Sequence, residues 1–551
     1  MLNSSLKIYG NGTRRIKCLF HLITFHQISE CLCFMQRSII RWQIQQLLLK
    51  MSISFNHIPS NIRVPLFYAE VDNSMANTAT AAKKALLIGQ KTDGTAIDGK
   101  PTLISSQSQA MTKFGRGAPL TLAVKAFKDQ NTSTELWCLP MAVTGTPATG
   151  AVEFKGMATE SGTIAFYVGA TKVPVTVASG TLAANIATDL INAINANKDL
   201  PITASTSTTD TENATAIKLT AKTVGLYGND ILLATNRQGA TGGEEDIAGI
   251  SLTITAMSGG TGEIDYAKAF KAVETETFWF IGCPDSSSTA LDAYKKEMQD
   301  STGRWAYSRM QFGHIFTAKR GDAESLVTFG KTRNDQHVSL FGIEENNPNL
   351  ILEVVGAILG RAASYYTNDP ARPLQTGPLE GLLAPSIEDR FGFNEQNTLL
   401  SNGIATLYQQ SGTVMIQRAI TTYQFNSFGD ADNSYLDSTT LYTLAEIISR
   451  LKTAITSKYP RHKLANDGTR YGAGQAIVTP SVIKSELIAQ YQKMEEEGLV
   501  ENADLFAKYL IVERDANDVN RINVLLPPDL VNQLRIFALQ AQFRLQYSST
   551  D

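Results

Sequence analysis

Histidine, the side chain that most often carries protons or binds metals near neutral pH, is scarce in this chain. The 551 residues include six histidines, two of them before Met51. None of the other four has a second histidine two to four residues away, which is the spacing that a helical metal site needs. Those four are His57, His314, His337 and His462. We interpret His314 and His337, which adjoin apolar runs, as structural residues, and we expect no metal and no cofactor.

Two short motifs resemble catalytic or phosphate-binding signatures but lack the companions that those chemistries require. Residues 481–484 (Ser-Val-Ile-Lys) have the Ser-x-x-Lys pattern of serine acyltransferases, but the sequence contains neither Ser-Asp-Asn nor Lys-Thr-Gly. Residues 259–262 (Gly-Gly-Thr-Gly) lack the Gly-Lys-Ser/Thr ending of a phosphate-binding loop, which favours a turn. Cys31 and Cys33 have no partner ligands at metal-site spacing. We therefore predict that the chain is not an enzyme.

Charge and composition exclude several further classes of protein. Lysine and arginine together number 49, against 52 aspartates and glutamates. The chain therefore has no excess of basic residues that would suggest a nucleic-acid partner. Five cysteines are too few for a disulfide scaffold, and no run of about 18 apolar residues predicts a membrane span. A chain of this length, 43% hydrophobic, can form several packed domains.

The first fifty residues differ in composition from the rest. They contain seven of the 49 basic residues but only one of the 52 acids, Glu30. The segment lacks the apolar core and small-residue cleavage site of a secretory signal peptide. From Met51 onwards the sequence resembles an ordinary protein start. We therefore interpret residues 1–50 as a non-native upstream extension from a misassigned start codon, and a cleaved targeting segment is the alternative.

Short apolar runs alternate with helical patterns over residues 81–141 and 262–430. Such runs, ended by glycine or proline, are typical of parallel strands buried on both faces. They occur at 85–89, 136–139, 278–282, 313–316 and 338–342. Helices are expected around 120–127, 288–300, 322–333 and 351–359. This alternation predicts an α/β core with helices on both faces of a doubly wound sheet.

Between residues 142 and 261 the apolar residues alternate with period two. Ile217 and Leu219 show this pattern, and so do residues 250–254. One helical pattern, at 182–194, interrupts the strands, and turns rich in glycine and threonine bound the segment. We predict a β-rich domain that is inserted into the α/β core and projects outward.

The remaining chain predicts a C-terminal α+β domain over residues 431–530 and two extended terminal arms. Helices are expected at 441–455 and 480–497, and strands at 509–513 and 521–526. Residues 51–80 and 531–551 each contain a stretch in which apolar and polar residues alternate. This pattern is typical of a strand with one buried face. For residues 51–80 it fits either a flexible terminus or a strand that pairs with a sheet edge of another subunit, and residues 534–547 are predicted to form a long terminal strand with one apolar face.

Five segments together resemble the tail sheath proteins of Mu-like contractile phages. They are Ser-Phe-Asn-His-Ile-Pro-Ser-Asn-Ile-Arg-Val-Pro at 54–65, Lys-Ala-Leu-Leu-Ile-Gly-Gln at 84–90, the glycine-rich turn at 259–262, Val-Leu-Leu-Pro-Pro-Asp-Leu-Val-Asn-Gln-Leu at 524–534 and Phe-Arg-Leu-Gln-Tyr at 543–547. The resemblance runs from Met51 to the C-terminus, and the family has no counterpart of residues 1–50.

The resemblance implies a structural protein whose core is subtilisin-like in fold without protease activity. It implies hexameric rings stacked helically around a tail tube, and a contraction that drives the tube into the host envelope after a baseplate signal. The implied partners are further copies of the chain, the tail tube protein, and baseplate and tail terminator proteins, with no nucleic acid and no membrane span. The implied location is the virion tail, after synthesis in the host bacterial cytoplasm.

These expectations single out three groups of residues for assembly. The intersubunit arms are expected to present Ile62, Val64, Leu66, Phe67 and Tyr68 at one end of the chain, and Phe543, Leu545 and Tyr547 at the other. The expected acceptor strand in a neighbour presents Ile522, Val524 and Leu526. The basic stretch Lys458, Arg461 and Lys463 suits an acidic tube surface, with a solvated helix end as the alternative.

Three alternative functions stay open. A subunit of this kind could instead build the sheath of an R-type bacteriocin, a type VI secretion system or another contractile injection system. The inserted domain at 142–261 could act as a receptor-binding module. A serine hydrolase, which the subtilisin-like label suggests, needs serine, histidine and aspartate together at strand ends, and the few histidines disfavour it.

Overall fold

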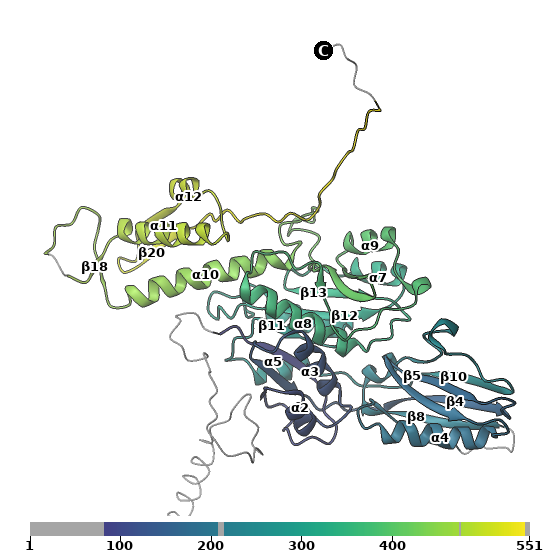
Figure 1. The fold of residues 1–551 in the computed structure, drawn as a ribbon. Coiled ribbons are helices and arrows are strands. Elements are labelled where there is room, and N and C mark those ends of the chain that lie inside the picture. Colours follow the sequence, from purple (N-terminus) through teal and green to yellow (C-terminus); the bar gives the residue numbers. More distant parts are fainter. Residues whose placement is uncertain (1–81, 208–213, 473–474, 546–551) are drawn as a thin grey trace, which may run out of the picture. The chain divides into compact units, whose positions relative to one another are not determined.

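The computed structural model describes residues 82–207, 214–472 and 475–545 (Figure 1). The described residues fall within one compact unit. Residues 1–50 and several of the expected arm residues lie outside the described ranges, namely Ile62, Val64, Leu66, Phe67, Tyr68 and Tyr547.

A nine-stranded sheet forms the centre of the fold, in the order β14-β16-β15-β13-β12-β11-β1-β3-β2. From β15 to β3 neighbouring strands are parallel, whereas the outer pairs at both edges are antiparallel. The strands are β1 (Ala85–Gly89), β2 (Thr102–Ile104), β3 (Leu136–Pro140), β11 (Phe280–Gly282), β12 (His314–Arg320), β13 (Val338–Ile343), β14 (Gly377–Pro378), β15 (Ala405–Gln410) and β16 (Thr413–Arg418). Every residue of β1, β11 and β13 is buried, as expected for apolar strands that are covered on both faces.

Helices cover both faces of this sheet, and strand β1 shows how. Ala85 and Leu87 join an apolar cluster with α3 and α8, whereas Leu86 and Ile88 join a second cluster with α5, α6, α7 and α9. The helices of this region are α2 (Gln107–Phe114), α3 (Pro119–Gln130), α5 (Tyr266–Ala272), α6 (Ser288–Met298), α7 (Ala323–Gly330), α8 (Ile351–Asn368), α9 (Phe393–Leu400) and the short η3 (Ile387–Asp389). The predicted mixed α/β class is confirmed.

Helices α3 and α8 pack closely because α8 carries glycines at the contact. A Cβ atom added at Gly356 would lie 2.3 Å from the carbonyl oxygen of Ala123, and one at Gly360 would lie 2.6 Å from that of Phe127. A side chain at either position would therefore push the two helices apart.

Two smaller sheets and one helix form the chain between β3 and α5. A four-stranded sheet has the order β10-β4-β8-β7 and a three-stranded sheet the order β6-β5-β9. The elements are β4 (Pro147–Gly156), β5 (Gly162–Val168), β6 (Thr171–Val177), α4 (Ala183–Ala196), β7 (Ile202–Thr206), β8 (Ala214–Val224), η1 (Leu226–Asp230), β9 (Leu233–Thr235), η2 (Ala240–Gly242) and β10 (Ile250–Ser258). Their buried side chains are continuous with the cluster of α3 and α8, so a separate domain at 142–261 stays a prediction.

Two threonines join the chain where it enters and leaves these sheets. The amide of Thr146 donates to the hydroxyl of Thr261 at 3.1 Å, and the two hydroxyl oxygens lie 2.9 Å apart. The amide of Thr261 donates in turn to the carbonyl oxygen of Thr146 at 3.1 Å. We call this pair the threonine clasp.

The C-terminal part of the fold has its own apolar cluster around Tyr491 and Phe506, whose rings stack with centroids 3.7 Å apart. Its elements are α10 (Ser438–Lys458), β17 (Lys463–Leu464), β18 (Ile477–Val478), α11 (Pro480–Glu496), α12 (Ala503–Tyr509), β19 (Ile511–Arg514) and β20 (Ile522–Leu525). The β17–β18 pair is parallel and the β19–β20 pair antiparallel. Helix α12 was not predicted, and it includes Tyr509, which the sequence pattern placed in a strand.

The strand expected over residues 534–547 has no partner strand within the described residues, so its pairing with another subunit stays a prediction. After the single bridge of Leu530 with Val500, residues 531–545 have no strand or helix assignment. Figure 1 draws them as a yellow trace without arrows or coils. A strand is defined by hydrogen bonds to a partner strand, and the described chain offers none here.

Candidate assembly surface

The described part of the C-terminal arm, residues 531–545, carries a row of exposed apolar side chains. Leu534, Ile536, Phe537, Leu539, Phe543 and Leu545 are between 74% and 96% exposed. Large apolar side chains gathered on an unpaired extended segment mark an interaction surface or an aggregation hazard. The two expected arm residues in this range, Phe543 and Leu545, are among the most exposed of the row.

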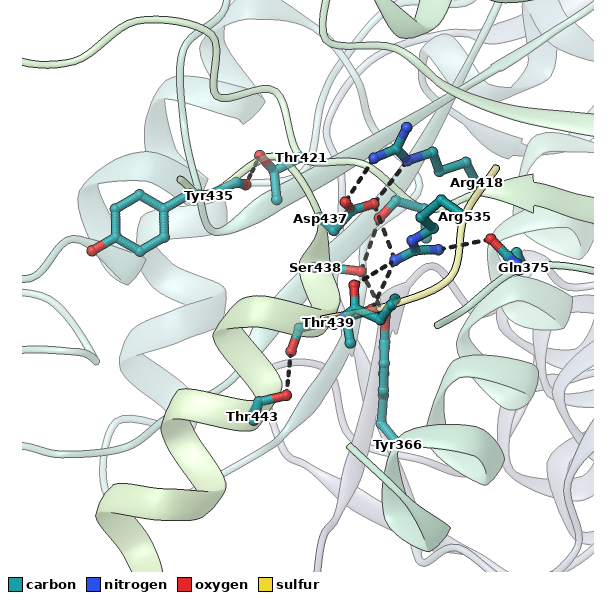
Figure 2. A network of polar contacts seen from close by, with 12 residues as sticks. Tyr366, Gln375, Arg418, Thr421, Tyr435, Asp437, Ser438, Thr439, Thr443 and Arg535 are labelled. Carbon is teal, nitrogen blue, oxygen red and sulfur yellow. Dashed lines mark hydrogen bonds and ion pairs between the residues drawn. The ribbon is translucent and has the colours of Figure 1, made fainter. Parts of the chain in front are cut away.

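Arg535 interrupts this row, because its side chain turns back onto the fold and is only 11% exposed (Figure 2). Its guanidinium lies 3.1 Å from a carboxylate oxygen of Asp437 and donates to the side chains of Gln375 at 3.1 Å and Thr439 at 3.3 Å. Burial lowers the pKa of Arg535, and the charge of Asp437 opposes that shift. These contacts tie the arm to the start of helix α10 and to the chain before β14.

Asp437 is shared by two arginines. Arg418 of β16 donates to both of its carboxylate oxygens, at 2.9 and 2.8 Å. Asp437 occupies the N-cap position of α10, but its side chain does not cap the helix, since the carboxylate faces the two guanidinium groups (Figure 2). The hydrogen bond with Asp437 raises the pKa of Arg418.

Tyr366 of α8 supports the floor of this network. Its hydroxyl lies 2.8 Å from that of Ser438 and 3.1 Å from that of Thr439. Its ring stacks on Tyr442 with centroids 4.2 Å apart, and Tyr442 stacks on Phe280 of the central sheet at 5.3 Å. The network is therefore built on buried aromatic packing.

A second attachment lies just before Arg535. The Tyr491 hydroxyl contacts the amide of Asp529 at 3.0 Å and its carbonyl oxygen at 3.2 Å. The side-chain amide of Asn502 donates to the Asp529 carboxylate at 2.7 Å, and Leu530 forms a bridge with Val500. Residues 529–530 thus belong to the cluster of α11 and α12.

The expected acceptor residues lie in or next to the β19–β20 hairpin. Ile522 and Val524 are in β20, and Leu526 directly follows it. Ile522 and Leu526 are half-buried against the α11–α12 cluster, whereas Val524 and Leu525 are 43% and 62% exposed. Within the described residues β20 pairs only with β19, so the hairpin presents free strand edges.

The three expected tube-facing residues follow one another at the end of α10 and in β17, and their environments differ. Lys458 pairs with Glu486 at 2.6 Å, and this hydrogen bond raises the pKa of Lys458. Lys463 reaches the side-chain oxygen of Gln475 at 3.5 Å. Arg461 is exposed. Lys458 is therefore paired with an acid, whereas Arg461 and Lys463 are more accessible.

The enzyme-like motifs do not assemble into a catalytic site in the described part of the chain. The Ser481 hydroxyl contacts Asp467 at 2.6 Å and Thr479 at 3.0 Å, and neither of these partners is a histidine. His314 is buried and contacts Ser339 at 2.8 Å, and burial holds its pKa well below the usual value. The described residues contain no group of three or more potential metal ligands, and none of their helices is long and apolar enough to cross a membrane.

Sequence patterns missed Arg535, although it is the best-anchored residue of the arm. It stands at a polar position of the alternating stretch, where any exposed side chain would fit the pattern. Its partners come from residues 375, 437 and 439, which lie about 100 to 160 residues away. No local spacing could have indicated this contact.

Comparison with known protein families finds matches over much of the chain. Residues 259–422 match the family described as phage tail sheath protein central domain, and residues 430–544 match the phage tail sheath C-terminal domain. The chain is 39% identical over 501 residues to the Mu-like prophage FluMu tail sheath protein of Haemophilus influenzae. That alignment covers 90% of this chain and all of the relative.

The solved structures that match this chain, each with a TM-score below 0.5, include two bacterial sheath tail proteins. One from Desulfitobacterium hafniense is 12% identical with a TM-score of 0.46, over 86% of this chain and 97% of that one. One from Listeria innocua is 14% identical with a TM-score of 0.45, over 83% and 94%. The contracted helical sheath of the anti-feeding prophage is 11% identical with a TM-score of 0.39, over 89% and 100%. The assignment of this chain depends on the sequence matches and not on these structures.

Proposed function

The chain belongs to the phage tail sheath family, as a relative of its Mu-like members, and from this premise we propose that it polymerises as stacked hexameric rings around a tail tube. The family is structural and not enzymatic. In this proposal the sheath contracts after a baseplate signal and drives the tube into the host envelope. A phage tail is preferred because the FluMu relative is named for a Mu-like prophage, and the sheath of a bacteriocin or other injection system is the alternative.

We propose that the C-terminal arm links one subunit to the next by adding a strand to a neighbour's β19–β20 hairpin. The observation that carries this proposal is the exposed apolar row of residues 534–545, which has no partner within the described chain. A two-stranded hairpin is marginally stable alone and gains from a third strand. Main-chain hydrogen bonds contribute about 1 kcal/mol each, and the alternating side chains supply specificity.

A helical stack of subunits requires a head-to-tail contact, and an arm that reaches from one subunit to the next provides one. A head-to-tail contact that does not close on itself generates a helical polymer. An arm that reaches a neighbour can keep two subunits joined while their folded parts move as rigid bodies. The N-terminal arm at 51–80 has the same alternating pattern and is proposed to act likewise. The subtilisin-like character of the core and the tube contact of the basic stretch also stay predictions.

Truncation after Arg535 tests the arm. It removes residues 536–551 but keeps the contacts of Asp529, Leu530 and Arg535, which truncation after Pro528 would destroy. We expect a folded subunit with unchanged circular dichroism that forms no tubes in negative-stain micrographs. Tubes of normal diameter from the truncated chain would show that the arm is not the link.

A matched pair of full-length variants tests whether assembly needs the apolar side chains of the arm and not only the length of the arm. Phe543→Ser with Leu545→Ser removes two exposed apolar residues, and Gln540→Ser with Gln542→Ser changes two polar positions of the same arm. We expect the first pair to weaken tube formation and the second to leave it intact. Equal effects of the two pairs would argue against a strand with one buried face.

A further inference from the structure

We propose that a rigid loop of the core, residues 424–431, docks into a basic cleft on the next copy of this chain. We call this loop the aromatic knob, because Phe428 stands in the turn at its tip. The proposal rests on the proposed function, since it assumes that the subunits polymerise. It adds a contact between the folded parts of two subunits to the contact that the arms make.

The aromatic knob is held in one conformation by two asparagine side chains. The side-chain oxygen of Asn426 accepts from the amides of Phe428 at 2.9 Å and Asp430 at 3.0 Å. At the base of the loop, Asn334 donates to the carbonyl oxygen of Phe425 at 2.8 Å and accepts from its amide at 3.1 Å. A loop that is ordered before it binds loses little conformational entropy when it docks.

The tip of the knob offers an aromatic ring and a carboxylate. Phe428 is 89% exposed. Asp430 is exposed too, and its carboxylate has no ion-pair partner in the part of the chain that the structure describes. The nearby Asp432 is already occupied, because its carboxylate accepts from the hydroxyl of Tyr423 at 2.7 Å. An exposed aromatic side chain on a rigid support is typical of a binding hot spot.

A cleft with the complementary chemistry lies beside the end of α2. It is open, has a volume of about 560 Å³, and is lined by three cations together with Met111 and Asp93. The cations are Arg116, Lys198 and Lys222. Cations are attracted both to the face of an aromatic ring and to a carboxylate. We call this space the basic cleft, and it has room for the ring of Phe428.

The three cations of the basic cleft differ in how firmly they are held. Arg116 donates to both carboxylate oxygens of Asp199, at 2.7 and 2.6 Å. The Lys222 ammonium donates to the carbonyl oxygens of Lys198 at 2.7 Å and Arg116 at 3.4 Å. The Lys198 ammonium is exposed and has no ion-pair partner among the described residues. Lys198 is therefore the cation that we assign to Asp430 of the neighbouring copy.

The knob and the cleft lie at opposite edges of the central sheet. The chain enters the knob from Thr422, whose amide donates to the carbonyl oxygen of Val338, the first residue of β13. The cleft begins at Thr92, just after the last residue of β1. The strands from β1 to β13 are parallel, so the knob lies at their amino ends and the cleft at their carboxyl ends. Such a contact joins identical subunits head to tail, as a helical polymer requires.

Phe428→Ser tests the knob, and Phe393→Ser is the matched control because Phe393 is 81% exposed elsewhere on the core. We expect Phe428→Ser to raise the critical concentration for tube formation by roughly tenfold, with unchanged thermal unfolding. Tubes should still form at higher concentration, since the arms are intact. Sedimentation of tubes from full-length protein would measure this, and an unchanged critical concentration in Phe428→Ser would overturn the proposal.

A charge exchange tests the pairing of knob and cleft. Asp430→Lys and Lys198→Glu should each raise the critical concentration by roughly threefold, because attraction becomes repulsion. The chain with both changes should return close to the parent value, since the ion pair is then reversed across every contact. Glu496→Lys and Lys493→Glu are the controls, at exposed positions of the C-terminal part. A double variant at least as impaired as the two single variants together would overturn the pairing.

Cross-linking identifies the occupant of the cleft. A carbodiimide joins a carboxylate directly to an amine, and it would be applied to tubes grown from equal amounts of unlabelled and isotope-labelled chains. We expect an Asp430–Lys198 cross-link that joins a light peptide to a heavy one. If other cross-links between chains form but this one does not, the proposal is overturned.

Failure of the proposed function would look different. A parent chain that forms no tubes would overturn the proposed polymer. The same cross-linking of concentrated unassembled subunits would then decide the contact, because a light–heavy Asp430–Lys198 pair supports it and its absence overturns it. An effect of Phe428→Ser that is confined to growth on purified tail tubes would assign the knob to the tube, and docking between copies would be overturned.

Discussion

The guanidinium of Arg304 is completely buried and fastens a loop to the end of a helix. It donates to the carbonyl oxygens of Val273 at 3.0 Å and Glu276 at 2.8 Å, and to the carboxylate of Glu297 at 3.0 Å. Val273 is the C-cap residue of α5, where a cation also complements the helix dipole. A single charged side chain thus satisfies several polar groups that would otherwise be buried without partners.

Asp285 is a half-buried carboxyl group, and it carries a prediction about pH. Burial raises its pKa to about 6, although the hydroxyl of Tyr266, at 2.7 Å, lowers it. The folded protein therefore keeps the proton up to a higher pH than the unfolded chain does. This proton contributes stability below the unfolded pKa of about 4, and the contribution is lost as the pH rises through about 6. The loss is roughly 3 kcal/mol for this one group.

We expect Asp285→Asn to remove that decline, because an amide stays neutral and can still accept from Tyr266. Urea unfolding followed by tryptophan fluorescence at several pH values between 4 and 7 would measure it. Above pH 6 the variant should be at least as stable as the parent. The same slope with pH in both proteins would contradict the assignment to Asp285.

At the scale of elements, the outcome of sequence analysis depended on where each element finds its partners. Strand β1 was predicted with its bounds because a fully apolar run needs only burial on both faces. Helix α12 was missed because its seven residues are too few to show a periodic stripe. The arm has the pattern of a strand but no partner in the described chain, and Arg304 and Arg535 depend on distant carbonyl and carboxylate groups. Local patterns therefore predicted the sheet, but not the polar contacts of the assembly surface.

The end of α10 carries a prediction about the tail tube. Because Lys458 already pairs with Glu486, Arg461 and Lys463 are the residues to reverse. Arg461→Glu with Lys463→Glu should reduce sheath growth on purified tubes, since each exposed pair contributes only about 0–1 kcal/mol but recurs in every subunit. Negative-stain microscopy would compare sheathed tubes with sheath polymers grown without tubes. Lys493→Glu with Lys508→Glu is the charge-matched control, because it reverses two other exposed lysines, and equal loss of both kinds of polymer would speak against tube contact.

At the scale of the whole molecule, the chain combines a segment of unusual composition with a longer part that matches known sheaths. Residues 1–50 hold one acid against seven bases. The alignment with the FluMu relative spans 501 residues and covers that protein completely. The interpretation of residues 1–50 as an upstream extension stays a prediction that only a shortened chain can test.

We expect a chain that starts at Met51 to fold and polymerise like the full-length protein, because the segment before it contributes no predicted arm or core element. Circular dichroism and the diameter of tubes in micrographs would be compared for the two chains. Failure of the shorter chain to assemble, at equal concentration and with unchanged secondary structure, would show that the first fifty residues take part in assembly.

The threonine clasp has a consequence for the order in which this chain can fold on the ribosome. Strands β1 and β11 are hydrogen-bonded neighbours, with Ala85 beside Phe280, but the whole of β4 to β10 is synthesised between them. Pairing distant strands requires closing a long loop, which slows folding. Once Thr146 and Thr261 meet, residues 147–260 no longer add to the length of that loop. We therefore expect the two sheets of β4 to β10 to form first. Strands β1 and β11 of the central sheet would pair only after those sheets are complete.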